Sequence, residues 1–289
     1  MLFSYLKYKT ENSNSKILQK LYYGLLKQNY RYISGPFRVL PDFFVIGVAR
    51  SGTTSLFHYL NQHPNIVGAL YDELGYFDDN YHLGTNWYRS LFPTIFTKKR
   101  IQKEHGKFLS FDVTTRYIEQ KSTAANIKEL KPDMKIIVIL RNPIDRAYSN
   151  YNLVKNPELT FEETIKNEIN EIKSVNLELK DESYLVNNFY EKILPRGFYA
   201  KQLEFWHKIF PKEKIFIQTS EEFAKNTHEV LNQIFDFLEI KHVKIKDITK
   251  HNVRKFPPME QKTRDYLLDF FRPYNESLYK LIGKKFDWN

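Results

Sequence analysis

The chain has 289 residues, 42% of them hydrophobic, which suits one large α/β domain with a sizeable core and excludes a mainly disordered protein. It has no cysteine, which excludes disulfides, thiolate metal sites and a cysteine nucleophile. The formal net charge of +10 is spread without a block of five or more cations, which favours a specific anion site over a nucleic-acid-binding tail.

Residues 1–38 are predicted to be a helical extension, followed by one domain over residues 39–289. Apolar residues recur at helical spacing in the extension, with lysines between them: Ile17, Leu18, Leu21, Tyr22, Leu25 and Leu26. The pattern favours a helix docked on its own domain, and a peripheral membrane-surface helix is the alternative. We expect a cytoplasmic location, because the sequence has neither a signal-peptide layout nor a long apolar run.

Five apolar runs are predicted as strands, namely Phe43–Val48, Ile66–Leu70, Phe108–Val113, Lys135–Leu140 and Ile215–Gln218. Helices are predicted over Thr54–Leu60, from Pro143 with Asn142 as N-cap, and over Gly197–Phe210, Glu229–Leu238, Met259–Phe271 and Glu276–Ile282. The alternation predicts a single α/β domain, a P-loop-like doubly wound parallel sheet flanked by helices.

The segment GVARSGTT lies between the first strand and its helix. Gly47 and Gly52 have the spacing of a phosphate-binding P-loop, in which backbone N–H groups at a helix N-terminus face a phosphate. A nucleotide triphosphatase needs lysine directly after the second glycine, and here Thr53 stands there, while the cation is Arg50. The loop is therefore predicted to hold phosphate and to be poorly equipped for ATP or GTP hydrolysis; a ligand-free Gly turn is the alternative.

A second anion site is predicted at Arg141, which follows the strand KIIVIL directly. Ligands of open α/β sheets bind outside the carboxyl ends of the strands, and arginine binds phosphate as a fork. Ser149 lies two turns into the following helix. An ion pair of Arg141 with a neighbouring carboxylate is the alternative. Two separated anion sites together favour a nucleoside ligand with two anionic groups.

GVARSGTTSL followed by LRNPIDRAYSNY resembles the paired donor-binding motifs of sulfotransferases that use 3′-phosphoadenosine-5′-phosphosulfate (PAPS). DELGYFDDNYHLGTNWYRSLFP, NVRKFPP and the C-terminal helices are similar to segments of heparan sulfate N- and 3-O-sulfotransferases. The resemblance covers about Asp42 to Trp288. It implies donor contacts at the first loop, the second motif and the basic closing loop, namely at Arg50, Ser51, Gly52, Thr53, Thr54, Ser55, Arg141, Ser149, Arg254 and Lys255.

The same resemblance implies roles in transfer, with PAPS as donor, adenosine 3′,5′-bisphosphate (PAP) as product and no metal. Glu73 matches the family's glutamate and is the candidate base. Arg50 replaces the loop lysine and is expected to stabilise the leaving phosphate, and His82 is expected to assist. Asp78 occupies a substrate-facing position of the motif. The family's lysine in the segment FDVTTRYI is replaced by Val113, with Arg116 as a candidate replacement at the substrate.

An acidic or neutral saccharide is the predicted acceptor, because aromatic side chains and excess cations suit sugar rings and acidic polymers. The sequence defines no oligomeric state. Three alternatives remain. A sulfotransferase for a small molecule or lipid shares the donor motifs. A P-loop kinase or a nucleotide-binding protein without transfer activity shares only the first loop. A basic nucleic-acid binder is the weakest of the three.

Overall fold

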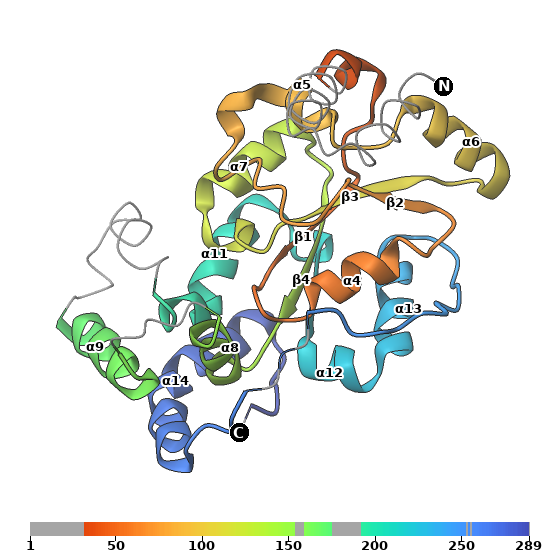
Figure 1. Cartoon of the computed structure of the whole chain (residues 1–289). Coiled ribbons are helices and arrows are strands. Elements are labelled where there is room, and N and C mark those ends of the chain that lie inside the picture. Colours follow the sequence, from red (N-terminus) through yellow and green to blue (C-terminus); the bar gives the residue numbers. More distant parts are fainter. Residues whose placement is uncertain (1–31, 154–158, 175–191, 253, 255, 289) are drawn as a thin grey trace, which may run out of the picture.

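The protein is described by a computed structural model that places residues 32–153, 159–174, 192–252, 254 and 256–288 (Figure 1). A five-stranded sheet of order β2-β3-β1-β4-β5 forms its centre, and every neighbouring pair is parallel. The strands are β1 (Phe43–Gly47), β2 (Ile66–Gly68), β3 (Leu109–Val113), β4 (Lys135–Leu140) and β5 (Ile215–Thr219). The five predicted strands and their parallel arrangement are confirmed.

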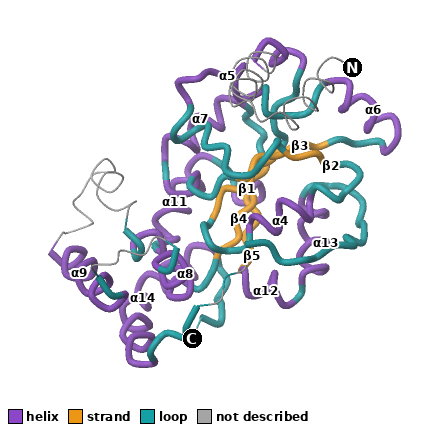
Figure 2. The backbone as a smooth tube through the Cα atoms, viewed as in Figure 1, coloured by secondary structure: helices purple, strands orange, loops and turns teal. Residues whose placement is uncertain are grey.

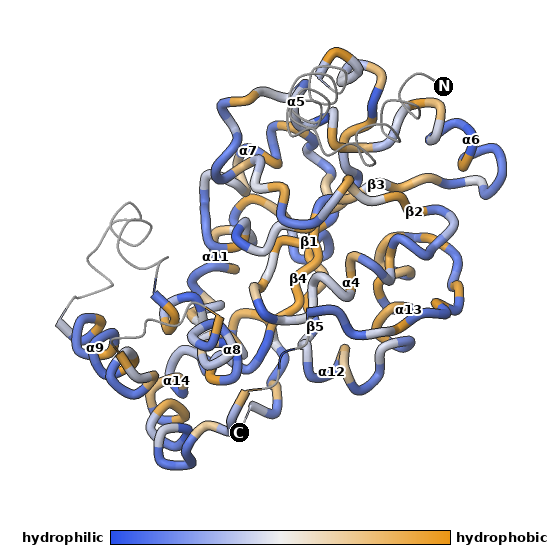
Figure 3. The backbone as a smooth tube through the Cα atoms, in the orientation of Figure 1, coloured by the Kyte–Doolittle hydropathy of each residue, from blue (hydrophilic) through white to orange (hydrophobic). Residues whose placement is uncertain are grey.

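The middle strands are buried on both faces. All five residues of β1 are buried, as are all residues of β4 after Lys135. These are the continuous apolar runs that a parallel sheet needs when helices cover both of its sides. In Figure 3 the hydrophobic colours gather along β1 and β4 in the middle of the molecule.

Helices cover the two faces of the sheet in separate sets. Alternate strand residues point to opposite faces, so Phe43 and Val45 join one core cluster while Phe44 and Ile46 join the other. The first cluster packs against α4 (Thr53–Leu60), α12 (Ser220–Lys225) and α13 (Thr227–Phe237). The second packs against α7 (Lys121–Leu130) and α11 (Tyr199–Ile209). Figure 2 shows strands enclosed by helices on both sides, which is the predicted doubly wound arrangement.

Three further helices form a third cluster beside the sheet, namely α8 (Pro143–Tyr151), α9 (Phe161–Ser174) and α14 (Gln261–Ile282). Helix α8 starts as predicted, with Pro143 in its first turn and the Asn142 side chain accepting from the Ile144 N–H at 2.9 Å. The other helices of the described residues are α5 (Gly84–Arg89), α6 (Ile95–His105) and the 3-10 turns η2 (Gly35–Phe37), η3 (Tyr81–Leu83), η4 (Tyr117–Glu119), η5 (Pro195–Gly197) and η6 (Lys212–Lys214).

One prediction about the C-terminal part is wrong. The two helices expected over Met259–Phe271 and Glu276–Ile282 are a single helix, α14, with Pro273 inside it. Proline removes one backbone hydrogen bond and usually breaks a helix. Here Phe271 and Leu278, on either side of the proline, are both buried, so packing on the domain holds the two halves in one helix.

Most of the predicted extension, including its apolar helix, lies outside the described residues. The division at residue 38 therefore stays a prediction, as does the peripheral membrane contact. None of the helices in the described part of the chain is long and apolar enough to cross a membrane.

Candidate functional site

The loop between β1 and α4 presents backbone amides at the carboxyl edge of the sheet. The Val48 N–H donates to the carbonyl of Ile139 in β4 at 2.8 Å, and the Ser51 hydroxyl donates to the Val48 carbonyl at 2.6 Å. Gly52, at φ 88°, is the N-cap of α4 and contributes no side-chain cap. The first N–H groups of α4 and the positive end of its dipole are thus available to an anion.

Arg50 joins the two predicted anion sites. Its Nε donates to the Ser149 hydroxyl of α8 at 3.0 Å, and its carbonyl accepts from Nη1 of Arg141 at 2.7 Å. The backbone of Arg50 has φ 73°, which is uncommon for a residue other than glycine. Burial, and then the charges of Arg141 and Arg254, lower the pKa of the Arg50 guanidinium. An anion among the three guanidinium groups would relieve their repulsion.

These groups share a cavity of about 480 Å³. Its lining includes nine residues predicted from the sequence, namely Arg50, Ser51, Gly52, Thr53, Thr54, Ser55, Arg141, Ser149 and Arg254. Lys255 lies outside the described residues. Two carboxylates also line the cavity, and both are engaged, since Glu221 accepts from the Asn142 N–H at 2.9 Å and Asp145 pairs with Arg264. The cavity is therefore built for an anionic ligand, and donor binding by these residues stays a prediction.

The segment 247–252 packs against α4, and its residues 250–252 help to line this cavity. The Tyr59 hydroxyl donates to the Ile248 carbonyl at 2.7 Å, and the His251 N–H donates to the Ser55 hydroxyl at 2.9 Å. The rings of His251 and His58 stack at 3.9 Å. Sequence reasoning predicted a closing loop from Arg254 onward and missed Tyr59 and His251, because these contacts join positions almost two hundred residues apart.

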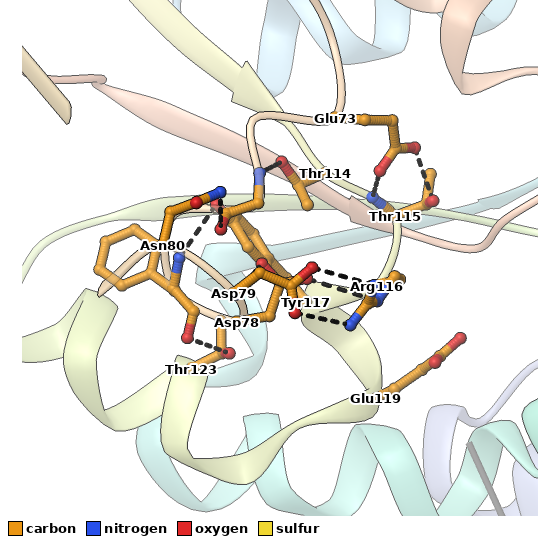
Figure 4. A network of polar contacts seen from close by, with 12 residues as sticks. Glu73, Asp78, Asp79, Asn80, Thr114, Thr115, Arg116, Tyr117, Glu119 and Thr123 are labelled. Atoms are coloured by element: carbon orange, nitrogen blue, oxygen red, sulfur yellow. Dashed lines mark hydrogen bonds and ion pairs between the residues drawn. The ribbon is translucent and has the colours of Figure 1, made fainter. Parts of the chain in front are cut away.

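Glu73, the candidate base, lies on a loop beside the carboxyl end of β3. Its N–H donates to the Val113 carbonyl at 2.6 Å, and its backbone has φ 58°. Its carboxylate accepts from the Thr115 N–H at 3.0 Å and from the Thr115 hydroxyl at 2.6 Å, as Figure 4 shows. Desolvation of the carboxyl group raises the pKa of Glu73, although the residue as a whole is exposed; the bonds from Thr115 oppose this, and Asp72 and Asp78 add to it.

Gly47, the last residue of β1, lies close to residues 115–118, and Thr115 of that segment holds the Glu73 carboxylate. A Cβ atom at Gly47 would lie 2.7 Å from Cγ2 of Ile118 and 3.2 Å from the carbonyl oxygen of Thr115. Only glycine lets β1 pass so close to the segment that holds Glu73. Glu73 does not line the cavity; it is linked to the end of β1 through Thr115, whose N–H and hydroxyl hold its carboxylate.

The predicted substrate-binding residues Asp78 and Arg116 contact each other. Nε of Arg116 lies 3.4 Å from Oδ2 of Asp78, and its two terminal nitrogens donate to Asp79 at 3.1 and 3.2 Å. The Arg116 side chain is 49% exposed, whereas that of Asp78 is 1% exposed, so the Asp78 side chain is buried and Asp79 is the surface partner of Arg116. The role of Arg116 as a substitute for the lysine stays a prediction.

Val113 and His82 complete the placement of the predicted residues. Val113 is completely buried and packs in the core cluster beneath α4 and α13, so its side chain is unavailable to a ligand. His82 is exposed in η3 and does not line the cavity that contains Arg50 and Arg141. Within the described part of the chain, His, Asp and Glu side chains form no group of three or more that could hold a metal ion.

The fold and this site define an α/β protein with a P-loop-like anion site at the carboxyl edge of a parallel sheet. A family model described as "Sulfotransferase domain" matches residues 40–269, which is most of the chain. The chain therefore belongs to the sulfotransferase domain family, as its motifs predicted.

Individual relatives agree with this membership. The membrane-associated sulfotransferase kil1 of Dictyostelium discoideum is 28% identical, over 89% of this chain and 68% of its own length. Heparan sulfate glucosamine 3-O-sulfotransferase 3B1 of Mus musculus is 27% identical, over 86% of this chain and 65% of its own. For the human bifunctional heparan sulfate N-deacetylase/N-sulfotransferase 3 the identity is 27%, over 85% of this chain and 30% of the relative. The chain thus spans only part of these relatives.

A solved structure confirms the fold. The sulfotransferase from Alicyclobacillus acidocaldarius superposes with a TM-score of 0.63 at 26% identity. The match covers 86% of this chain and 98% of that protein. The doubly wound sheet with a P-loop-like first loop is therefore shared with a protein of the same family.

Proposed function

We propose that the protein transfers a sulfuryl group from PAPS to a hydroxyl or amine of a saccharide acceptor. The observation that carries this proposal is the cavity in which Arg50 links the β1–α4 loop to Ser149, with Arg141 hydrogen-bonded to the same loop. Two anion-binding elements, one loop at a helix N-terminus and one arginine–serine pair, share a single cavity. A nucleoside with phosphate groups at two positions matches that arrangement.

In this proposal the loop residues hold the 5′-phosphosulfate, and Arg141 with Ser149 holds the 3′-phosphate. The acceptor oxygen or nitrogen forms a bond to sulfur while the bond from sulfur to the 5′-phosphate oxygen breaks. The acceptor proton passes to the Glu73 carboxylate, and PAP leaves with its new phosphate charge facing Arg50. The raised pKa of Glu73 suits a base for a weakly acidic group.

A saccharide acceptor is supported by the heparan sulfate sulfotransferases among the relatives, two of which are named above. Exposed aromatic rings at Tyr71 and Tyr81, both 45% exposed, flank the Glu73 loop in sequence and suit contact with sugar rings. Thr53 stands where a kinase of P-loop type needs its lysine, so phosphoryl transfer from ATP is disfavoured. A small-molecule or lipid acceptor remains the alternative for the same donor site.

Calorimetry with PAP tests the donor half of the proposal. The wild type should bind PAP, and Arg141→Ala and Ser149→Ala should each weaken binding by about tenfold or more, since each removes a hydrogen bond to a charged group. Arg272→Ala is the matched control, because Arg272 is an exposed arginine paired with Asp269 and does not line the cavity. A wild type that binds no PAP would contradict the proposal.

Transfer of labelled sulfate from PAPS tests the acceptor half. The acceptors are desulfated heparan sulfate, a neutral oligosaccharide, a phenol and a long-chain lipid alcohol. We expect transfer to at least one of the two saccharides. Transfer confined to the phenol or the lipid would replace the saccharide with the alternative acceptor class and leave the donor site unchanged.

A further inference from the structure

The carboxylate of Asp112, in strand β3, is completely buried beneath the Glu73 loop. Three hydroxyl groups donate to it. The Thr114 hydroxyl donates to Oδ1 at 2.8 Å, and the hydroxyls of Tyr88 and Tyr117 donate to Oδ2 at 2.8 and 3.2 Å. A buried carboxylate is costly unless it is hydrogen-bonded in this way, so the three hydroxyl groups are oriented toward it.

Two of these hydroxyls also accept hydrogen bonds from backbone N–H groups of the loop that carries the candidate base. The Tyr117 hydroxyl accepts from the N–H groups of Tyr76 and Phe77 at 2.8 and 3.3 Å, and the Thr114 hydroxyl accepts from the Gly75 N–H at 3.4 Å. Figure 4 shows the Thr114 hydroxyl in contact with an amide of this loop. A hydroxyl has one proton and two lone pairs. Because Asp112 accepts each proton, the lone pairs face the loop amides.

The tethered amides follow Glu73 almost immediately in the chain. Glu73 itself has φ 58° and Gly75 has φ 61°, so two of three consecutive residues have a left-handed backbone conformation. A left-handed conformation is unfavourable for glutamate and persists only where neighbouring contacts enforce it. The amide bonds to Thr114 and Tyr117 supply such contacts, together with the bond from the Glu73 N–H to the Val113 carbonyl.

We propose that Asp112 is a positioning residue for the transfer reaction, orienting the Thr114 and Tyr117 hydroxyls so that they hold residues 75–77 and thereby the carboxylate of Glu73. This inference rests on the proposed function, in which Glu73 is the base. Asp112 touches neither donor nor acceptor in this arrangement. It acts through the two hydroxyls, and Thr115 then fixes the Glu73 carboxylate directly.

Tyr88 provides a matched control for Tyr117. Both tyrosines are completely buried, and both donate to the same oxygen of Asp112. Both also pack on the loop's aromatic rings: Tyr88 stacks on Tyr76 at 4.2 Å, and Tyr117 lies edge-on to Phe77 at 5.6 Å. Only Tyr117 accepts loop amides. Tyr117→Phe therefore removes the hydrogen bonds from the Tyr76 and Phe77 N–H groups to the Tyr117 hydroxyl. Tyr88→Phe removes a buried hydrogen bond to Asp112 and leaves those two bonds in place.

Two measurements on the full chain separate positioning from simple stability. Hydrogen exchange of the amides of residues 75–77 should speed up by about tenfold in Tyr117→Phe and little in Tyr88→Phe, since one lost hydrogen bond corresponds to about that factor. With PAPS and desulfated heparan sulfate, or whichever saccharide the wild type sulfates, kcat should fall by about tenfold or more in Tyr117→Phe alone. The KM for PAPS and the affinity for PAP should stay at wild-type values in both variants.

Equal exchange and equal kcat in the two variants would overturn the inference, as would faster exchange in Tyr117→Phe with unchanged kcat. Failure of the proposed function has a different signature, because the wild type would then bind no PAP or transfer no sulfate. In that event the exchange comparison still decides whether the Tyr117 hydroxyl holds residues 75–77, since it needs no substrate. Equal exchange rates then refute these hydrogen bonds, and unequal rates support them.

Discussion

Replacing Asp112 with asparagine should change how the stability of the fold depends on pH. Burial raises the pKa of the Asp112 carboxyl from its ordinary 3.8 to about 7; the hydroxyls of Tyr88, Thr114 and Tyr117 oppose the shift and the charge of Glu73 adds to it. At pH values between these two pKa values, Asp112 holds its proton in the folded state and has lost it in the unfolded state. The free energy of unfolding therefore falls as pH rises through this range.

The size of the effect follows from the shift. One pKa unit corresponds to about 1.4 kcal/mol, so the full effect is on the order of 4 kcal/mol, of which about 3 kcal/mol falls between about pH 4.5 and pH 7.5. Asparagine has nearly the same shape but does not titrate, so Asp112→Asn lacks this contribution. The stability of Asp112→Asn relative to wild type should consequently increase with pH by about that amount.

Urea denaturation of both proteins at constant ionic strength, repeated across this pH range, measures the difference directly. Other titrating groups contribute to both curves and cancel to first order. A difference that stays constant within about 1 kcal/mol from the acid to the neutral end would show that Asp112 titrates normally in the fold. The description of Asp112 as a desolvated carboxylate would then be wrong.

Two further predictions concern Glu73 and Gly47. Glu73→Gln should retain PAP binding in calorimetry, and its rate of sulfate transfer should fall by about a hundredfold or more. The wild-type rate should rise with pH through the raised pKa of Glu73. A Glu73→Gln variant with intact transfer would exclude Glu73 as the base. Gly47→Ala should lower the unfolding free energy by about 1–3 kcal/mol, because the new methyl group meets Ile118 and the Thr115 carbonyl. Unchanged stability in urea would contradict the close approach of β1 to these two residues.

The strands were predictable because a strand that is buried on both faces is a continuous run of apolar residues. The composition of Lys135–Leu140 alone predicts a strand, and its residues after Lys135 are all buried. Several helices were missed for the opposite reason. Helix α6 buries only Ile101 among its eleven residues, and α7 only Thr123, Ala124 and Ile127, so a hydrophobic pattern is barely present in either. The proline of α14 misled the prediction because tertiary packing outweighed the local rule.

The candidate site was predictable where it is local in sequence. The spacing of Gly47 and Gly52 and the position of Arg141 after its strand suffice to predict both anion sites. The bond from Arg50 to Ser149 joins residues 99 positions apart, and no local pattern shows that the two sites merge. Asp112 did leave a signal that sequence reasoning overlooked. It is the one acid in β3, whose sequence is LSFDV, and an acid in a buried strand needs hydrogen-bond partners.

Arg50 and Glu73 each lie near groups of their own charge. Burial is the larger effect at both residues; in addition, Arg141 and Arg254 destabilise the charged form of Arg50, and Asp72 and Asp78 destabilise the charged form of Glu73. A neutral ligand would relieve neither repulsion. A donor with phosphate groups neutralises the arginines, and an acceptor that gives up a proton neutralises the carboxylate. The proposed reaction supplies both at once, because the phosphosulfate donor brings its charge to Arg50 and the acceptor gives its proton to Glu73.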